Sequence, residues 1–206
     1  MTTTAVADSV AFWSGATPPN LVLTLQSSVD LATVTSVSLG LTDAGGSAIA
    51  GTTGVLDAAA STVTVTFPPD PFTMKGIYTL DLALELPVGT EVVDPVQLVV
   101  QAQDGWLTLQ QARDMWPQAP DDDVTLTMLL DSAQIACEAF APKLLDGTKV
   151  PVNYRQAQFQ QARALWLAMS ANQDSRIGGD EFAITVFPLD WNVKQLLRPR
   201  GIPVIF

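Results

Sequence analysis

Apolar and polar residues alternate with a period of two along the first half of the chain. The clearest runs are 21–25, 34–41, 62–67, 78–86 and 96–100, and each places large apolar side chains on one face, as a pleated strand requires. Turn residues separate the runs, and the stretch 87–90 joins two long ones, which predicts a hairpin. Several short strands within about 100 residues are typical of an antiparallel β-sandwich of immunoglobulin-like type.

The pattern changes to helical spacing after Gly105. Thr108 can cap a short helix that Pro117 stops, and the aspartates 121–123 precede a longer helix. The apolar stripe of that longer helix is Leu126, Leu130, Ala133, Cys137 and Phe140.

A third helix is expected from about 152 to 172. Its apolar stripe, which we expect to be buried, is Phe159, Ala162, Trp166 and Met169, widened by Leu165 and Ala168. A short strand over 182–187 and a last helix from Asp190 to Arg198 follow, and an apolar tail ends the sequence.

These patterns predict an α+β chain of two domains. Residues 1–103 form the immunoglobulin-like antiparallel β-sandwich, and residues 104–206 form a small helical bundle with a short β-strand and an extended C-terminal tail. The charge divides at the same place. Residues 1–104 carry ten acidic side chains and one basic side chain, Lys75, whereas residues 105–206 carry eleven acidic and nine basic ones.

Composition argues against most enzyme classes. The 206 residues include 21 acidic and 10 basic side chains and no histidine, and the formal charge is −11. A Ser–His–Asp triad, a Cys–His pair and a His-ligated zinc are therefore excluded, and Cys137, the single cysteine, cannot form an internal disulfide. The negative balance argues against binding of nucleic acid through its phosphates. We expect no enzyme, no cofactor and no bound metal.

The sequence gives no indication of export or of insertion into a membrane. The first ten residues lack the basic start and apolar core of a signal peptide, and no apolar window is long enough to span a bilayer. We expect synthesis in a reducing cytoplasm and no membrane partner.

Four features are candidates for chemistry or binding. The aspartates 121–123 are interpreted as a helix cap rather than a cation site, because they lack the spacing of a calcium loop. Cys137 is interpreted as a small buried hydrophobe. Arg155 and Arg163, with Gln156, Gln160 and Gln161 around them, form either a solvated helix face or a contact with a neighbouring copy, to which Leu167 would add apolar area.

The fourth feature is the C-terminal tail. Ile202, Val204, Ile205 and Phe206 follow two arginines, Arg198 and Arg200. Such a β-prone apolar segment either folds back on its own core or adds a strand to another protein.

The second half resembles the head-to-tail adaptor (connector) proteins of long-tailed bacteriophages. The resemblance covers most of residues 105–206, with order and spacing kept, in WLTLQQAR (106–113), WP (116–117), APDD (119–122), YRQAQ (154–158), QARALW (161–166), TVFPLDW (185–191) and LLRP (196–199). The first half is similar to the immunoglobulin-like N-terminal module of phage baseplate upper proteins in PNL (19–21), DLATV (30–34) and GIYTL (76–80). Minimal adaptors lack such a module, so its presence departs from the family pattern.

The resemblance implies a structural protein of the virion neck at the portal vertex. Family members form a homo-oligomeric ring, usually a dodecamer, beneath the portal protein; the ring extends the DNA channel and binds the next connector or tail component. DNA would pass without specific binding. The implied portal-docking residues are Arg198, Arg200, Ile202, Val204, Ile205 and Phe206, and the candidate subunit-interface residues are Arg155, Arg163 and Leu167.

Three other interpretations remain open. The chain could be another neck, tail or baseplate component, or a non-enzymatic immunoglobulin-like binding protein, although a secreted or surface protein would need an export signal. A carbohydrate-active enzyme would need two carboxylates in one cleft.

Overall fold

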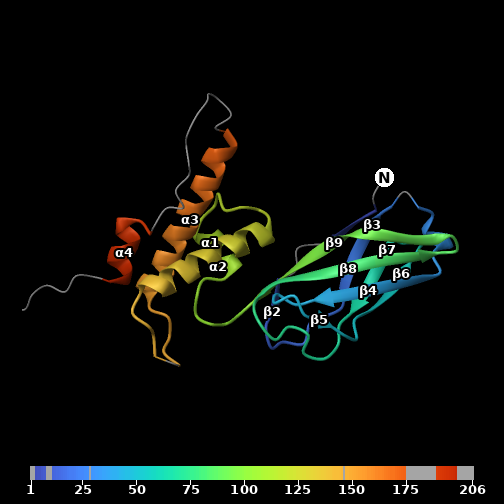
Figure 1. The fold of residues 1–206 in the computed structure, drawn as a ribbon, viewed down its shortest axis with the longest axis horizontal. Helices are drawn as coiled ribbons and strands as arrows, with labels where there is room; N and C mark the ends of the chain where they lie inside the picture. The colour runs from blue at the N-terminus through green and yellow to red at the C-terminus, as the bar shows by residue number, and fades with distance from the viewer. Residues whose placement is uncertain (1–2, 8–10, 28, 146, 175–188, 199–206) are drawn as a thin grey trace, which may run out of the picture. The chain divides into compact units, whose positions relative to one another are not determined.

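The computed structural model describes residues 3–7, 11–27, 29–145, 147–174 and 189–198, with the backbone alone for 171–174. The chain is a mixed structure of β-sheets and helices. Its internal contacts divide it into two compact units, Met1–Gln103 and Asp104–Phe206. All described strands lie in the first unit and all described α-helices in the second (Figure 1), so the α+β class is confirmed.

The first unit consists of two sheets. A four-stranded sheet has the order β1 (Thr4–Ala7), β3 (Leu21–Gln26), β7 (Thr62–Thr66) and β6 (Thr53–Asp57). A five-stranded sheet has the order β2 (Ala11–Trp13), β9 (Gly89–Gln101), β8 (Gly76–Leu86), β4 (Ser36–Thr42) and β5 (Ala48–Ile49). A 3₁₀ turn, η1 (Leu31–Thr33), lies between β3 and β4.

Alternation of side chains builds one hydrophobic core from both sheets. The three leucines of β3 are buried while the residues between them are exposed, and Val63 and Val65 of β7 are fully buried. From the five-stranded sheet, β8 contributes its alternate residues, Tyr78, Leu80, Leu82 and Leu84. All five runs with period-two alternation are therefore confirmed as strands.

The β8–β9 hairpin is also confirmed, and its turn is tighter than the predicted stretch. Leu86 pairs with Gly89, so only Pro87 and Val88 lie in the turn. Gly89 has a φ of +104°, a conformation that glycine adopts without the steric penalty of a Cβ.

One pairing departs from the antiparallel prediction. β2 runs parallel to β9, with Ala11 opposite Val99 and Trp13 opposite Gln101. β1 lies in the four-stranded sheet and β2 in the five-stranded sheet, so the N-terminal segment contributes to both.

The second unit contains α1 (Leu109–Met115), α2 (Asp123–Phe140), α3 (Val152–Asp174) and α4 (Trp191–Leu197). The expected N-caps of α1 and α2 are confirmed: Thr108 and Gln111 form a capping box, and Asp122 accepts from the Thr125 amide. Asp190 occupies the N-cap position of α4, but its side chain makes no capping hydrogen bond.

The predicted buried face of α2 is confirmed, and that of α3 is wrong except at Ala162. Leu126, Leu130, Ala133 and Cys137 are buried on α2, with Phe140 half-buried. On α3, Met169 is exposed and Phe159 and Trp166 are only half-buried. Ala162 is the one residue of the predicted stripe that is buried. The other buried side chains described on α3 are Tyr154, Ala157, Gln158 and Gln161, because the first half of α3 packs against α2 through this face. The expected strand over 182–187 lies outside the described residues.

Candidate functional site

A buried glutamine fixes the position of α3. The side chain of Gln158 is 1% exposed; its Nε2 donates to the Leu130 carbonyl oxygen of α2 at 3.1 Å, and its Oε1 accepts from the Leu107 amide at 3.0 Å. Both halves of the amide are therefore bonded, as burial of a polar group requires. The start of α1, the middle of α2 and the first half of α3 are joined at this side chain. Sequence reasoning missed its role, although Gln158 shares a helix face with Tyr154, Gln161 and Ala162 at i, i+4, i+7 and i+8 spacing.

The aspartates 121–123 hold the start of α2. Asp122 accepts from the Thr125 amide at 2.7 Å, while Asp123 forms an ion pair with Arg113 of α1 at 2.6 Å. Arg113 also donates to the Asp121 carbonyl oxygen at 2.8 Å. The side-chain hydrogen bond from Thr125 lowers the pKa of Asp122. The interpretation of these aspartates as a helix cap is confirmed for Asp122. Within the ranges that the structure describes, no three acidic or cysteine side chains gather as a metal site would require.

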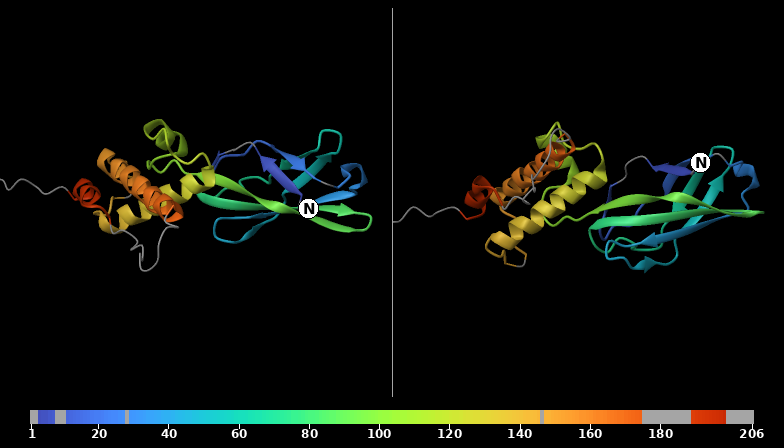
Figure 2. Two further views of the ribbon diagram at one scale, coloured as in Figure 1. Left: turned by 90° about the horizontal axis from the view of Figure 1, so that it is seen from above. Right: turned by 45° about the horizontal axis from the view of Figure 1, so that its top comes forward.

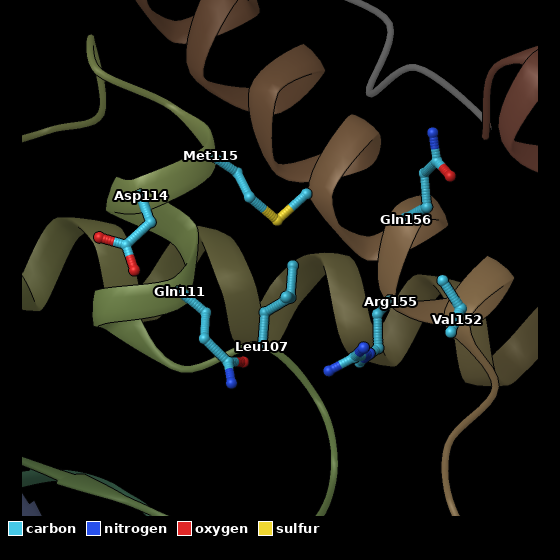
Figure 3. Close-up of a pocket in the computed structure, with 7 residues that line it drawn as sticks. All are labelled: Leu107, Gln111, Asp114, Met115, Val152, Arg155 and Gln156. Atoms are coloured by element: carbon cyan, nitrogen blue, oxygen red, sulfur yellow. The ribbon is translucent and has the colours of Figure 1, made fainter.

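Arg155 lines a cavity between α1 and the first turns of α3. In Figure 3 the side chains of Leu107, Met115 and Arg155 point toward the space between the two helices, whereas those of Asp114 and Gln156 point away from it. The cavity has a volume of about 430 Å³ and is lined by Leu107, Gln111, Asp114, Met115, Val152, Arg155 and Gln156. Val152 and Met115 are 70% and 49% exposed, so the cavity has an uncovered apolar rim next to a guanidinium group.

The two ionic groups of the cavity differ in their surroundings. Asp114 accepts from Gln110 Nε2 at 2.8 Å. Arg155 has no ion pair or side-chain hydrogen bond with any of the described residues. Its guanidinium group is thus available to a carboxylate from outside this part of the chain.

Arg163 is held on an aromatic surface. Its guanidinium carbon lies 5.6 Å from the centroid of the Phe159 ring and 6.0 Å from that of the Trp116 ring, and those two rings meet edge to face. Stacking restricts the side chain while leaving its N–H groups free to point away from the rings. Leu167, one turn further along α3, is 63% exposed. The structure places all three candidate interface residues on the surface of one helix.

The candidate docking tail falls mostly outside the described residues. Arg198 is the exception: it caps the end of α4, and its guanidinium carbon lies 4.7 Å from the Phe140 ring centroid. Arg200, Ile202, Val204, Ile205 and Phe206 lie outside the described residues.

Cys137 is confirmed as a buried side chain of the helical core. It packs with Trp106, Tyr154 and Val193, and burial raises the pKa of its thiol to about 12. A thiol that stays protonated at neutral pH is a poor nucleophile and a poor metal ligand.

A second cavity, of about 500 Å³, lies in the first unit beside η1. Asp30 is the one acidic residue among its lining residues, and its carboxylate caps η1 by accepting from the Ala32 amide. The cavity beside Arg155 likewise has one acidic lining residue, Asp114. Neither cavity therefore brings together the two carboxylates that glycoside hydrolysis uses.

No protein-family model matches the chain, and no curated protein matches it. None of the helices in the described ranges has the length and apolar character to cross a bilayer.

Proposed function

We propose that the chain is a structural protein of a bacteriophage virion, a head-to-tail adaptor that forms an oligomeric ring under the portal protein. In this proposal residues 104–206 are the adaptor domain and residues 1–103 an immunoglobulin-like β-sandwich domain attached to it. The ring would extend the DNA channel and bind the next connector or tail component.

The observation that carries the proposal is the surface of α3. Arg155, the stacked Arg163 and the exposed Leu167 follow one another along a single helix. Arginine is enriched at protein interfaces, where its guanidinium group supplies hydrogen bonds, and an exposed side chain such as that of Leu167 adds apolar area that a partner can cover. This supports α3 as a contact between neighbouring subunits.

The charge is compatible with a channel for DNA. A net charge of −11 repels phosphate groups, so DNA could pass through such a ring without being retained. The two cavities described above each have one carboxylate among their lining residues, and Cys137 is buried with a raised pKa, so these groups do not supply a carboxylate pair or a reactive thiolate.

The tail 198–206 is proposed to bind the portal protein. The support is its sequence: two arginines followed by four large apolar side chains within five residues. Arg198, packed on Phe140, would mark the point where this segment leaves the helical unit.

Native mass spectrometry of the chain mixed with the portal protein from the same source tests the proposal. The expected result is a complex in which a defined multiple of 21.9 kDa is added to the portal ring. A chain that stays monomeric beside an unmodified portal would contradict the adaptor role.

A further inference from the structure

The tip of the β8–β9 hairpin is an exposed apolar projection. Val88, in the turn, is 95% exposed, and Val92, on β9, is 70% exposed. The pairing of β4 with β8 ends at Glu85. At the tip, Leu86 and Gly89 therefore pair only with each other. In both views of Figure 2 the hairpin extends past the other strands of the first unit. Two exposed valines make a small patch, so the case for a contact at this tip depends on the charges beside it and on a surface that fits it.

Two carboxylates flank this tip, and each is held in place. Glu85 Oε2 accepts from Thr90 Oγ1 at 2.7 Å, and Glu91 Oε1 accepts from Thr3 Oγ1 at 2.9 Å. Each carboxylate has a second oxygen that can accept from a cation. The tip thus combines an apolar end with negative charge on both strands.

The cavity between α1 and α3 has the complementary character. Its rim is apolar at Met115 and Val152, and it has two ionic groups: Asp114, which accepts from Gln110, and Arg155, which forms no ion pair with a described carboxylate. An apolar tip flanked by carboxylates fits the Arg155 side of this cavity, where the apolar rim meets the guanidinium group, and not the Asp114 side, where like charges would repel.

We propose that the β8–β9 tip of one copy of the chain docks in the α1–α3 cavity of a second copy. Val88 would enter between Met115 and Val152, and Glu85 or Glu91 would pair with Arg155. The inference rests on the proposed ring, and it gives the first unit a role in building it. Because the two surfaces differ and each copy carries both, the contact is head-to-tail and generates a ring if it closes.

One hairpin tip buries too little area for a stable pair. Specific pairs bury about 800 Å² on each partner, which is more than a turn of two residues can supply. We therefore expect weak association between two copies and stable association only when every tip in a closed ring is seated, or when α3 adds its own contact.

Cysteine cross-linking of the full chain tests the contact. Val88→Cys and Val152→Cys would be made separately and together in a Cys137→Ala background, and a Val55→Cys variant serves as a matched control because Val55 is also 70% exposed but lies on β6. Oxidation is carried out on the chain alone and on the chain mixed with the portal protein. Mixing the Val88→Cys and Val152→Cys variants should give a cross-linked dimer, and the double variant should give a ladder of oligomers. Mixing Val55→Cys with Val152→Cys should give at least about tenfold less dimer.

Three results would overturn the contact. They are a Val88–Val88 dimer formed as readily as the mixed one, an internally linked monomer from the double variant, or no cross-link either with or without portal. Native mass spectrometry on the same samples separates the two proposals. Portal binding without the cross-link rejects this interface and leaves the adaptor role standing, whereas loss of both rejects the adaptor role as well.

A charge exchange gives an independent readout. Arg155→Glu should lower the yield of the mixed cross-link about fivefold, the size expected of one exposed ion pair. Glu85→Arg or Glu91→Arg in the partner copy should restore it. If neither reversal restores the yield, Arg155 does not pair with the tip.

Discussion

The side-chain amide of Gln158 on α3 is hydrogen-bonded to the carbonyl oxygen of Leu130 in the middle of α2. The same amide accepts from the backbone just before α1, so one side chain sets the spacing of three helices. The cavity beside Arg155 lies between two of these helices, and Leu107, whose amide donates to Gln158, is one of its lining residues.

Replacing Gln158 by Leu should destabilise the chain by about 1–3 kcal/mol, because two buried backbone groups lose their partner. Urea denaturation followed by circular dichroism measures the change. Gln156→Leu, at an exposed position two residues earlier, is the control and should leave the midpoint almost unchanged. Equal midpoints for the two variants would show that the buried amide contributes nothing.

Leu167→Asp should weaken ring formation about tenfold while leaving the folded monomer intact, because a charge would replace apolar area at the proposed contact. Sedimentation velocity at several concentrations measures the assembly. Ile135→Asp is a matched control: Ile135 is 67% exposed, close to the value for Leu167, but lies on α2. Unchanged assembly of the Leu167 variant would remove α3 from the interface.

Deleting residues 200–206 should abolish portal binding and leave the helical content unchanged, because the deleted segment lies beyond α4. Pull-down with the portal protein and far-ultraviolet circular dichroism measure the two properties. A deletion variant that still binds would move the portal contact to another part of the chain.

Asp122→Ala should cost about 1 kcal/mol of stability at neutral pH, the usual contribution of an N-cap. The folded pKa of Asp122 is below its ordinary value of 3.8, so the carboxylate stabilises the fold above that pH. The contribution is lost as the pH falls through the folded pKa. The difference between the wild-type chain and the variant should therefore be constant near neutral pH and shrink below about pH 4.

Asp122→Asn is the control for this effect, because asparagine caps a helix without carrying a charge. Its stability should follow that of the wild-type chain at neutral pH and lack the acid-dependent loss. Chemical denaturation at several pH values measures all three chains, and a gap between wild type and Asp122→Ala that grows on acidification would contradict the assignment.

Cys137 should resist thiol reagents in the folded chain, because burial keeps its thiol protonated and covered. Labelling with a maleimide at pH 8 should be at least about tenfold slower in buffer than in urea. Equal rates would show that the core around Cys137 opens freely.

The strands with strong alternation were predictable from the sequence and the others were not. β6 illustrates the reason. Gly54 lies on its inward face, where a Cβ would come within 2.7 Å of the Leu39 side chain, so this position has no side chain to contribute to a pattern. Leu56 is thus the one large apolar residue on its inward face, too little for a period of two to be recognised. β2 is three residues long, too short for a period of two to be recognised in its sequence.

The face of α3 was mispredicted for a physical reason. Amide side chains at Gln158 and Gln161 are buried, while Leu167 and Met169 are exposed, the reverse of a hydrophobic pattern. A glutamine is buried when backbone groups of neighbouring elements bond to it, and these partners lie 28 and 51 residues away in the sequence. The spacing of residues within one helix carries no information about them.

The parallel pairing of β2 with β9 affects how the first unit responds to tension. In chain order, β2 is the first and β9 the last strand of the five-stranded sheet. Their paired residues run from Ala11 opposite Val99 to Trp13 opposite Gln101. A pull on the chain before β2 and after β9 acts in opposite directions along two parallel strands. The hydrogen bonds between them would then be loaded in shear and share the force, whereas an antiparallel terminal pair would be peeled apart one bond at a time.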